Sequence, residues 1–265
     1  MTPPVGDGAF ARWLAARAGE MLCALRDEVG FDDPARLRDA GDKRAHDLLV
    51  SALRQWRPDD EVLSEEGVDD PARLTAERVW IVDPLDGTRE FAEPGRVDWA
   101  VHVALWSRQV GLEAGAVALP AQHRILATDP RPPYPPLADP PAGRTAPPLR
   151  IAVSRSRPPA FVAEVAARLG AELVAMGSAG AKTAAVVTGA VDAYVHSGGQ
   201  YEWDSAAPVA VALATGLYAS RLDGSTLEYN RSDPFLPDLL VCRRDLAERL
   251  LTVVAECRQD RPEGA

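Results

Sequence analysis

The sequence predicts an α/β protein, with an α+β N-terminal half and an α/β C-terminal half. Three observations predict this class. Two stretches with helical apolar periodicity come first, short apolar runs typical of buried strands follow, and strands then alternate with helices toward the C-terminus. The 265 residues, 46% of them hydrophobic, are enough for one large domain or two small ones.

The N-terminal half begins with two predicted helices. Apolar side chains recur on one helical face over residues 9–29, and a second apolar stripe predicts a helix from Asp42 to Arg57 that Pro58 ends. The periodicity then changes to that of strands. A short strand begins at Glu61, and further strands are predicted over residues 78–82, 99–106, 113–119 and 123–128.

A proline-rich stretch then interrupts the pattern. Residues 130–148 hold nine of the 23 prolines and suit neither a helix nor a central strand, so we expect an exposed connection between residues 1–129 and residues 149–265. Strands and helices alternate beyond it. The predicted strands cover residues 149–154, 172–176, 192–196, 217–222 and 239–242, and the predicted helices cover residues 158–169, 180–190, 204–215 and 245–257.

Composition and missing motifs exclude several function classes. With 29 Lys and Arg against 39 Asp and Glu, the net charge of −10 disfavours a nucleic-acid partner. No apolar run approaches the ~20 residues of a membrane-spanning helix, and the N-terminus does not resemble a signal peptide, so we expect a cytoplasmic protein without membrane contact. Zinc-ligand spacings, nucleophilic-serine elbows, P-loops and dinucleotide fingerprints do not occur in the sequence.

An acidic motif directly follows one of the predicted buried strands. Asp83 and Asp86 lie three residues apart, and we expect Pro84 and Gly87 to turn the chain so that both carboxylates and the Leu85 carbonyl converge. Such hard oxygen donors suit Mg²⁺ or Mn²⁺. The motif therefore predicts a metal site.

The same turn offers groups for an anion. Gly87 leaves backbone N–H groups accessible, and Thr88 adds a hydroxyl at the same place. The alternative is an aspartate-rich surface turn. Turn carboxylates usually have polar neighbours, and the strand before this turn is apolar, which favours a functional site.

Three further acids extend the hypothesis, although each also has a structural alternative. Glu65 follows a short strand and could belong to a solvated loop, while Asp42 and Asp204 could cap helices. If these three converge with Asp83 and Asp86, their mutual repulsion requires two or three divalent cations. Bound cations would then present positive charge to a phosphate, which reconciles an acidic protein with an anionic ligand.

The motifs together resemble a known family. The segment Asp83–Phe91 resembles the D-P-[IL]-D-G-T-x-x-F signature of the inositol monophosphatase superfamily, and the segments Leu63–Gly67 and Trp203–Ala207 are similar to its G-E-E and W-D-x-A-A motifs. Within the superfamily, Gly177–Lys182 looks most like the CysQ-type branch of 3'-phosphoadenosine-5'-phosphate phosphatases, with an extra small residue near Ala179–Gly180. The resemblance implies a layered α-β-α-β-α sandwich that forms monomers or homodimers.

The resemblance further implies Mg²⁺-dependent hydrolysis of a phosphate monoester by a water that the metal ions activate. One metal would be held by Glu65, Asp83 and the Leu85 carbonyl. A second would be held by Asp83, Asp86 and Asp204, so that Asp83 bridges the two. Lithium is expected to inhibit by competing for the second metal position.

Catalytic and substrate contacts are implied in the same way. Thr88, with Asp42, would orient the water and accept its proton, and Glu65 completes the catalytic set. A solvent-facing position on its helix is the alternative for Lys182. The residues implied to bind substrate are Asp86, Gly87, Thr88, Ser178, Lys182 and Asp204.

Several substrates and activities stay open on the sequence. We favour 3'-phosphoadenosine 5'-phosphate and a role in sulfur assimilation because the likeness is greatest there, whereas inositol 1-phosphate and fructose 1,6-bisphosphate suit the metal centre equally. A haloacid-dehalogenase-type phosphatase is disfavoured, since it would need a D-x-D spacing and a free nucleophilic Asp83. A non-catalytic sensor of phosphate ligands or Mg²⁺ is the alternative of another class.

Overall fold

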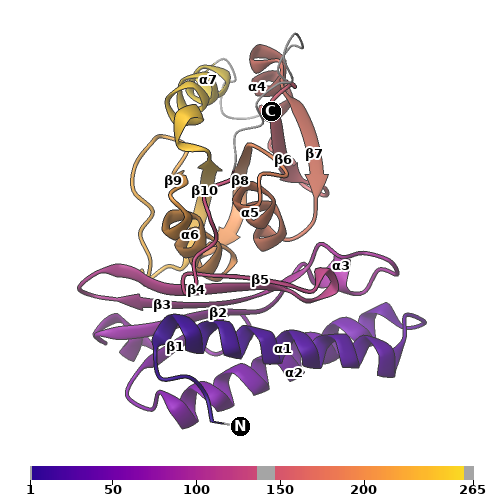
Figure 1. The fold of residues 1–265 in the computed structure, drawn as a ribbon, viewed down its shortest axis with the longest axis vertical. Coiled ribbons are helices and arrows are strands. Elements are labelled where there is room, and N and C mark those ends of the chain that lie inside the picture. Colours follow the sequence, from indigo (N-terminus) through magenta and orange to yellow (C-terminus); the bar gives the residue numbers. More distant parts are fainter. Residues whose placement is uncertain (1, 136–146, 260–265) are drawn as a thin grey trace.

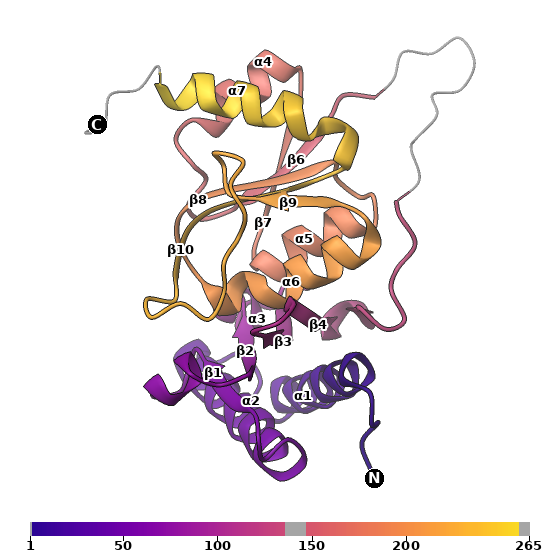
Figure 2. The same ribbon diagram turned by 90° about the vertical axis from the view of Figure 1, so that its left-hand side faces the viewer.

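A computed structural model describes residues 2–135 and 147–259 as five stacked layers. Helices α1 and α2 form one outer layer, and α4 and α7 form the other (Figures 1 and 2). Two five-stranded sheets lie inside them, with α5 and α6 between the sheets. This arrangement confirms the predicted α-β-α-β-α sandwich.

Two long helices cover the outer face of the first sheet. Helix α1 spans Asp7–Val29, close to its prediction, whereas α2 spans Pro34–Trp56 and begins before the predicted start at Asp42. The Asp33 side chain caps α2 by accepting a hydrogen bond from the Arg36 N–H, at 3.0 Å. Asp42 therefore lies inside the helix, and its alternative role as a helix cap is wrong.

Gly41 explains how α2 approaches the sheet so closely. A Cβ atom at this position would lie 2.8 Å from Leu85 Cδ2 and 2.8 Å from Phe91 Cε1. The missing side chain lets the helix axis approach the end of strand β2 and brings the next residue, Asp42, to the same place. A glycine in a helix interior is unfavourable on propensity alone, so packing outweighs it here.

The first sheet holds its five strands in chain order. Strand β1 pairs in parallel with β2, and the remaining neighbours are antiparallel. The strands are β1 Glu61–Ser64, β2 Arg78–Asp86, β3 Ala100–Ser107, β4 Gly111–Leu119 and β5 Arg124–Ala127. Helix α3, Thr88–Phe91, directly follows β2. Short 3₁₀ turns cover Pro71–Leu74, Pro120–Gln122 and Arg244–Leu246.

The second sheet is mixed, in the order β7-β6-β8-β10-β9. Strand β6 pairs in parallel with β7 and β8, while β10 is antiparallel to β8 and β9. Its strands are β6 Arg150–Ser154, β7 Glu172–Met176, β8 Ala193–Tyr201, β9 Tyr218–Ser220 and β10 Phe235–Cys242. The helices are α4 Val162–Leu169, α5 Ala179–Val187, α6 Glu202–Thr215 and α7 Ala247–Gln259. The predicted alternation of strands and helices is confirmed.

Side-chain alternation in β2 decides which face of the first sheet carries polar groups. Trp80 and Val82 pack with α1 and α2, whereas Val79 and Ile81 pack toward α5 and α6. Asp83 continues the second set. The end of β2 therefore directs polar groups into the middle of the sandwich.

Two expectations concern segments that the structure describes only in part. The proline-rich connection at residues 130–148 includes residues 136–146, which lie outside the described residues. The division into halves at residues 1–129 and 149–265 stays a prediction. Within residues 2–135 and 147–259, no helix combines the length and the hydropathy that a membrane crossing needs.

Candidate active site

A cleft of about 260 Å³ opens where the end of β2 meets the start of α5 and the end of β8. Its walls come from segments far apart in the sequence. The N-terminal half contributes residues 86–90, and the C-terminal half contributes residues 177–182 together with positions along β6 and β8. All six predicted substrate contacts line it: Asp86, Gly87, Thr88, Ser178, Lys182 and Asp204.

A register shift at the end of β2 brings its two aspartates to one face. Residues an odd number of positions apart point to opposite faces of a regular strand. Asp83 pairs with His102 but Asp86 pairs with Ala100, so β2 carries one extra residue and both carboxylates face the α5 and α6 layer. Leu85 packs on the opposite face, against α2.

The expected sharp turn at Pro84 is therefore wrong. Strand β2 continues through Pro84 to Asp86, and the chain turns only at Gly87, which has φ 86° and ψ 43°. Glycine suits this left-handed conformation. A Cβ atom there would also lie 3.1 Å from Ser178 Cβ and 3.2 Å from the Asp98 carbonyl oxygen.

Asp204 joins the two aspartates from the other half of the chain. One oxygen of each of Asp83, Asp86 and Asp204 lies within 4.8 Å of the others. Asp204 lies in the first turn of α6 and also accepts a hydrogen bond from the Tyr201 N–H, at 2.7 Å. The expected N-cap position of Asp204 is wrong, because Tyr201 is the N-cap of α6 and Asp204 is its third residue. Asp204 still stabilises the helix start through the bond to the Tyr201 N–H, while its carboxylate also belongs to the cluster.

Glu65 completes an acidic cluster whose charges repel one another. Its side chain is hydrogen-bonded to Asp83. Burial first, and the neighbouring carboxylates second, raise the pKa of Glu65 to about 8 and that of Asp204 to about 6, and they raise the pKa of Asp83 well above its ordinary value. Buried carboxylates that repel each other and offer only hard oxygen donors fit a divalent cation.

Asp86 differs from its neighbours because it is surrounded by donors. Its Oδ2 accepts hydrogen bonds from the Ser178 hydroxyl, at 2.5 Å, and the Gly180 N–H, at 2.7 Å, and lies 3.2 Å from His102 Nε2. Burial raises the pKa of Asp86, but His102, Lys182 and Ser178 outweigh it and lower the pKa to about 2. The Ser178 hydroxyl therefore stabilises the charged form of Asp86, and the sequence did not predict this contact.

His102 is a site residue that sequence reasoning missed. It lies on β3 opposite Asp83, with Nδ1 3.9 Å from Asp83 Oδ2. Burial disfavours its charge, but the Asp86 carboxylate outweighs burial, so the pKa of His102 is raised. A Cβ atom on Gly180 would lie 2.1 Å from His102 Nε2, which explains the small residue there. The lone histidine between Ala100 and Ala104 on one strand face was an available signal.

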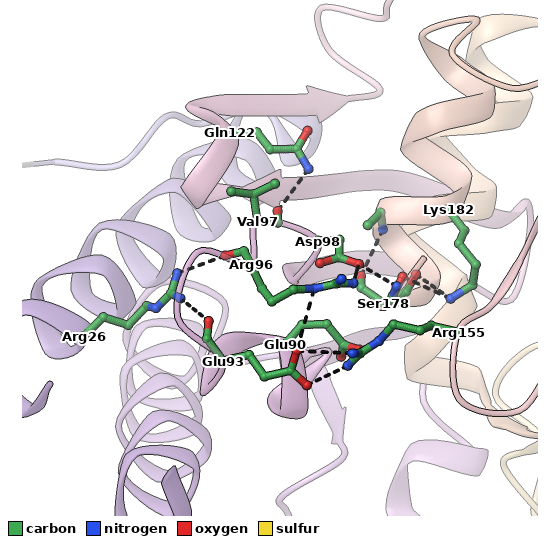
Figure 3. Close-up of polar contacts among 12 residues, drawn as sticks. Arg26, Glu90, Glu93, Arg96, Val97, Asp98, Gln122, Arg155, Ser178 and Lys182 are labelled. Carbon is green, nitrogen blue, oxygen red and sulfur yellow. Dashed lines mark hydrogen bonds and ion pairs between the residues drawn. The ribbon is translucent and has the colours of Figure 1, made fainter. Parts of the chain in front are cut away.

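Lys182 is buried, so the alternative of a solvent-facing position on its helix is wrong. Only 4% of the residue is exposed, and Nζ donates to the Gly177 carbonyl, at 3.1 Å, and the Ser178 carbonyl, at 2.7 Å. Figure 3 shows these bonds beside Asp98. Lys182 thus holds the start of α5 and places a positive charge near Asp86.

Thr88 and Asp42 meet beside the acidic cluster. The Thr88 hydroxyl lies 3.4 Å from Asp42 Oδ1 and 3.1 Å from the Leu85 carbonyl oxygen, so it can donate to either. Burial first, and Glu66 second, raise the pKa of Asp42 to about 7. A carboxylate with that pKa can hold or accept a proton near neutral pH.

An ionic network outside the predicted site joins the two halves. The Asp98 carboxylate accepts a hydrogen bond from the Gly177 N–H, at 2.6 Å, and is ion-paired with Arg96 (Figure 3). Arg155, just beyond β6, is paired with Glu90 and Glu93, at 2.7 and 2.8 Å. No motif predicted these contacts, since each partner is an ordinary charged residue in the sequence.

Comparison with known proteins agrees with this geometry. The inositol monophosphatase family model matches residues 9–131 and 142–259. The chain is 53% identical over 262 residues to a 3'-phosphoadenosine 5'-phosphate phosphatase of Mycobacterium leprae, covering 96% of this chain and 95% of the relative. It is 30% identical over 250 residues to a 3'(2'),5'-bisphosphate nucleotidase CysQ of Salmonella typhimurium, covering 84% and 94%.

The fold is similar to that of a solved structure. Inositol monophosphatase II of Staphylococcus aureus superimposes with a TM-score of 0.76 at 24% identity, over 95% of this chain and 96% of that one. At this identity the likeness concerns the fold alone.

Proposed function

The chain belongs to the inositol monophosphatase family, and on that premise we propose that it is a Mg²⁺-dependent phosphatase that converts 3'-phosphoadenosine 5'-phosphate to AMP and phosphate. The observation that carries the proposal is the convergence of one carboxylate oxygen each from Asp83, Asp86 and Asp204, residues far apart in the chain, at the cleft that Asp86 and Asp204 line. Enzymes of this family are generally metal-dependent, and the all-oxygen cluster fits that requirement.

Two Mg²⁺ ions are the proposed cofactor of this cluster. Glu65, Asp83 and the Leu85 carbonyl would hold one ion, and Asp83, Asp86 and Asp204 would hold the other. When bound, such ions lower the pKa of a water and neutralise charge on the leaving oxygen. The low pKa of Asp86, about 2, supports a permanently charged ligand at its position.

Thr88 and Asp42 are the proposed proton-handling pair. The Thr88 hydroxyl can donate to Asp42 Oδ1 and still accept a hydrogen bond from a water, which orients that water. Asp42, with a pKa near 7, can take the proton that the water loses. The oxygen of water becomes bonded to phosphorus, the bond between phosphorus and the 3'-oxygen breaks, and the 3'-oxygen takes a proton from solvent, to which Asp42 later releases the proton it accepted.

The remaining predicted substrate contacts surround the phosphate position. Gly87 and Thr88 offer backbone N–H groups beside the cluster, and the buried Lys182 supplies positive charge. Ser178 would act through Asp86, since its hydroxyl is already donated to that carboxylate. The oligomeric state, monomer or homodimer, and the cytoplasmic location stay predictions.

The choice of substrate rests on the names of the similar proteins. Both the relative at 53% identity and the CysQ relative are named for nucleotide bisphosphates. The test is kcat/KM for 3'-phosphoadenosine 5'-phosphate, inositol 1-phosphate and fructose 1,6-bisphosphate, measured side by side with Mg²⁺. The adenosine bisphosphate is expected to be the best of the three, and a preference for either other ester contradicts the proposal.

A control with excess chelator accompanies this assay. Phosphate release is expected to require the divalent cation, because without it the carboxylates repel the substrate. Metal-independent release would contradict the metal role. Absence of release from all three esters with Mg²⁺ would favour the sensor alternative.

A further inference from the structure

One arginine lies deep in the connection between Glu65 and strand β2. Arg73 belongs to the 3₁₀ turn Pro71–Leu74, and only 1% of the residue is exposed. Arginine is seldom buried to this extent unless its charge and its N–H groups have partners. The partners of Arg73 therefore show what the connection that begins at Glu65 is held to.

The guanidinium of Arg73 bonds both to its own connection and to a distant loop. Nε and Nη2 donate to the two carboxylate oxygens of Asp69, at 2.5 and 2.9 Å. Nη1 donates to Asn230 Oδ1, at 2.8 Å, and to the Arg231 carbonyl, at 2.9 Å. Asn230 Nδ2 donates back to the Arg73 carbonyl, at 2.9 Å. The connection after Glu65 is thus bonded to the loop between β9 and β10.

The same loop is bonded to Glu202, the first residue of α6. Asn230 has φ 58°, a left-handed conformation in which asparagine is enriched. The N–H groups of Asn230 and Arg231 donate to Glu202 Oε2, at 2.7 Å, and to Oε1, at 2.8 Å. The Glu202 N–H donates in turn to the Pro234 carbonyl, at 2.8 Å. Since only 1% of Glu202 is exposed, these bonds are shielded from water.

The residues that follow Glu202 reach the acidic cluster. The Trp203 carbonyl lies 3.1 Å from His102 Nδ1, and Asp204 is one of the three convergent carboxylates. After burial, the charge of Asp204 contributes most to the raised pKa of Glu65, so these two carboxylates lie close enough to repel each other. The network around Arg73 therefore connects two elements that each carry an acid of the cluster.

Stability alone is a poor explanation for such a network. Apolar side chains of similar volume can fill the same space without the cost of removing charges from water. The planar guanidinium of Arg73 and the carboxylate of Glu202 instead form directional pairs of bonds, which fix distances and angles. Contacts behind the ligands of a metal site influence its affinity, because they hold the ligands in place.

We propose that Arg73 is a positioning residue of the metal site. Acting through Asn230 and Glu202, it holds the start of α6 at a fixed place relative to its own connection. The separation of Glu65 and Asp204, one on each of the two connected elements, then suits bound divalent ions. The inference rests on the proposed function, since it requires that the cluster binds metal.

The experiment measures metal binding in the absence of substrate. Mn²⁺ suits the same oxygen donors as Mg²⁺, and electron paramagnetic resonance reports the free ion during a titration. Arg73→Met removes the guanidinium and keeps an unbranched side chain. Its Mn²⁺ dissociation constant is expected to be about 10-fold higher than that of the wild type, the size of a lost contact behind a metal ligand. A rise below about three-fold overturns the proposal.

Asn230→Gly breaks the same link at its other end. Glycine adopts a φ of 58° without strain and keeps the N–H that donates to Glu202, but both side-chain bonds with Arg73 are lost. A similar rise in the dissociation constant is expected, and the double variant should differ from either single one by less than about two-fold. Rises that multiply would mean independent effects and overturn the proposal. If Arg73→Met does not fold, Asn230→Gly decides by the same three-fold criterion.

Arg243→Met is the matched control for a general loss of stability. Arg243 makes two ion pairs, with Asp192 at 2.8 Å and Asp245 at 2.7 Å, and is not among the residues that line the cleft. Its Tm is expected to fall while the Mn²⁺ dissociation constant stays within about two-fold of wild type. If Arg243→Met weakens Mn²⁺ binding as much as Arg73→Met does, the role of Arg73 as a positioning residue is overturned.

The Mn²⁺ titration also separates this inference from the proposed reaction. A wild type that binds Mn²⁺ through Arg73-dependent geometry but does not hydrolyse 3'-phosphoadenosine 5'-phosphate overturns only the reaction. Hydrolysis by the wild type together with unchanged Mn²⁺ affinity in both single variants overturns only the positioning role. A wild type that does not bind Mn²⁺ overturns both.

Discussion

The Ser178 hydroxyl donates a hydrogen bond to Asp86 Oδ2, at 2.5 Å, across the boundary between the two halves of the chain. The same hydroxyl accepts a bond from the Ala181 N–H, at 2.9 Å, at the start of α5. One side chain thus caps a helix and stabilises a carboxylate charge on the opposite wall. This contact links the folding of the C-terminal half to the charge state of the acidic cluster.

Removal of that hydroxyl should therefore weaken both the fold and the site. Ser178→Ala is expected to lower the free energy of unfolding by about 1–3 kcal/mol, because a buried carboxylate loses a donor and α5 loses its cap. Urea denaturation with and without Mg²⁺ measures this. Thr188→Ala, which removes a hydroxyl bonded only to carbonyls in its own helix, serves as the control. If Ser178→Ala lowers the free energy of unfolding by no more than Thr188→Ala does, the role of the Ser178 hydroxyl in both Asp86 and α5 is contradicted.

Neutralising the central carboxylate should separate activity from stability. Asp83→Asn is expected to abolish phosphate release while raising the stability of the metal-free protein by about 1 kcal/mol, or roughly 2–4 °C in Tm. The amide can still accept the hydrogen bond from the Leu85 N–H that Asp83 Oδ1 accepts, at 3.0 Å.

Two measurements check this variant: phosphate release at saturating Mg²⁺, and thermal unfolding in chelator. Asp60→Asn is the control, because Asp60 lies outside the cleft and is bonded to Arg78, at 3.0 Å, and Trp80, at 2.9 Å. That variant should lose stability. Turnover retained in Asp83→Asn would count against the metal scheme.

The raised carboxyl pKa values predict how stability depends on pH. Asp42, Glu65 and Asp204 have folded-state pKa values of about 7, 8 and 6, above the ordinary range. A carboxyl group whose pKa is higher in the folded state than in the unfolded state stabilises the fold at low pH, where it is protonated. That stabilisation is fully present below the unfolded-state pKa and is lost as the pH rises through the folded-state pKa. The metal-free protein should therefore become less stable between pH 6 and pH 8.

Thermal melts in chelator at pH 6 and pH 8 test this, with Mg²⁺ added in a parallel series. The stabilisation by Mg²⁺ should be larger at pH 8, where more carboxylates must be neutralised. The decline with pH in chelator should be shallower in Asp83→Asn, since one repelling charge is gone. A Tm in chelator that is constant or rises over this range would contradict the assigned repulsion.

A hydroxyl at position 88 is predicted to matter for turnover rather than for folding. Thr88→Val keeps the shape but removes the bonds to Asp42 and the Leu85 carbonyl, and kcat is expected to fall about 10²- to 10⁴-fold, the usual contribution of proton handling. Thr88→Ser, which keeps the hydroxyl, should retain most of kcat. Steady-state kinetics with 3'-phosphoadenosine 5'-phosphate distinguish the two, and equal losses would point to packing instead.

The local pattern of apolar and turn residues was enough to predict most of the helices and strands. Strands β6 and β7 and helix α1 follow their predictions closely, because apolar periodicity and turn residues act over a few neighbouring positions. The start of α2 was missed because Gly41 interrupts the helical pattern. Its contacts with Leu85 and Phe91, which only the fold creates, compensate for the poor propensity.

The chemistry of the site and its assembly have different origins. The sequence by itself determined which residue types are available, since Asp83, Asp86 and Thr88 are neighbours on one segment and the acids repeat in family-like motifs. Only the tertiary structure decided that the β2 register shift brings both aspartates to one face. It also decided that the Ser178 hydroxyl donates a hydrogen bond to Asp86 and that Arg157 lines the cleft. These relationships join residues far apart in the chain, and strand register and packing between layers, rather than local preference, set the distances between them.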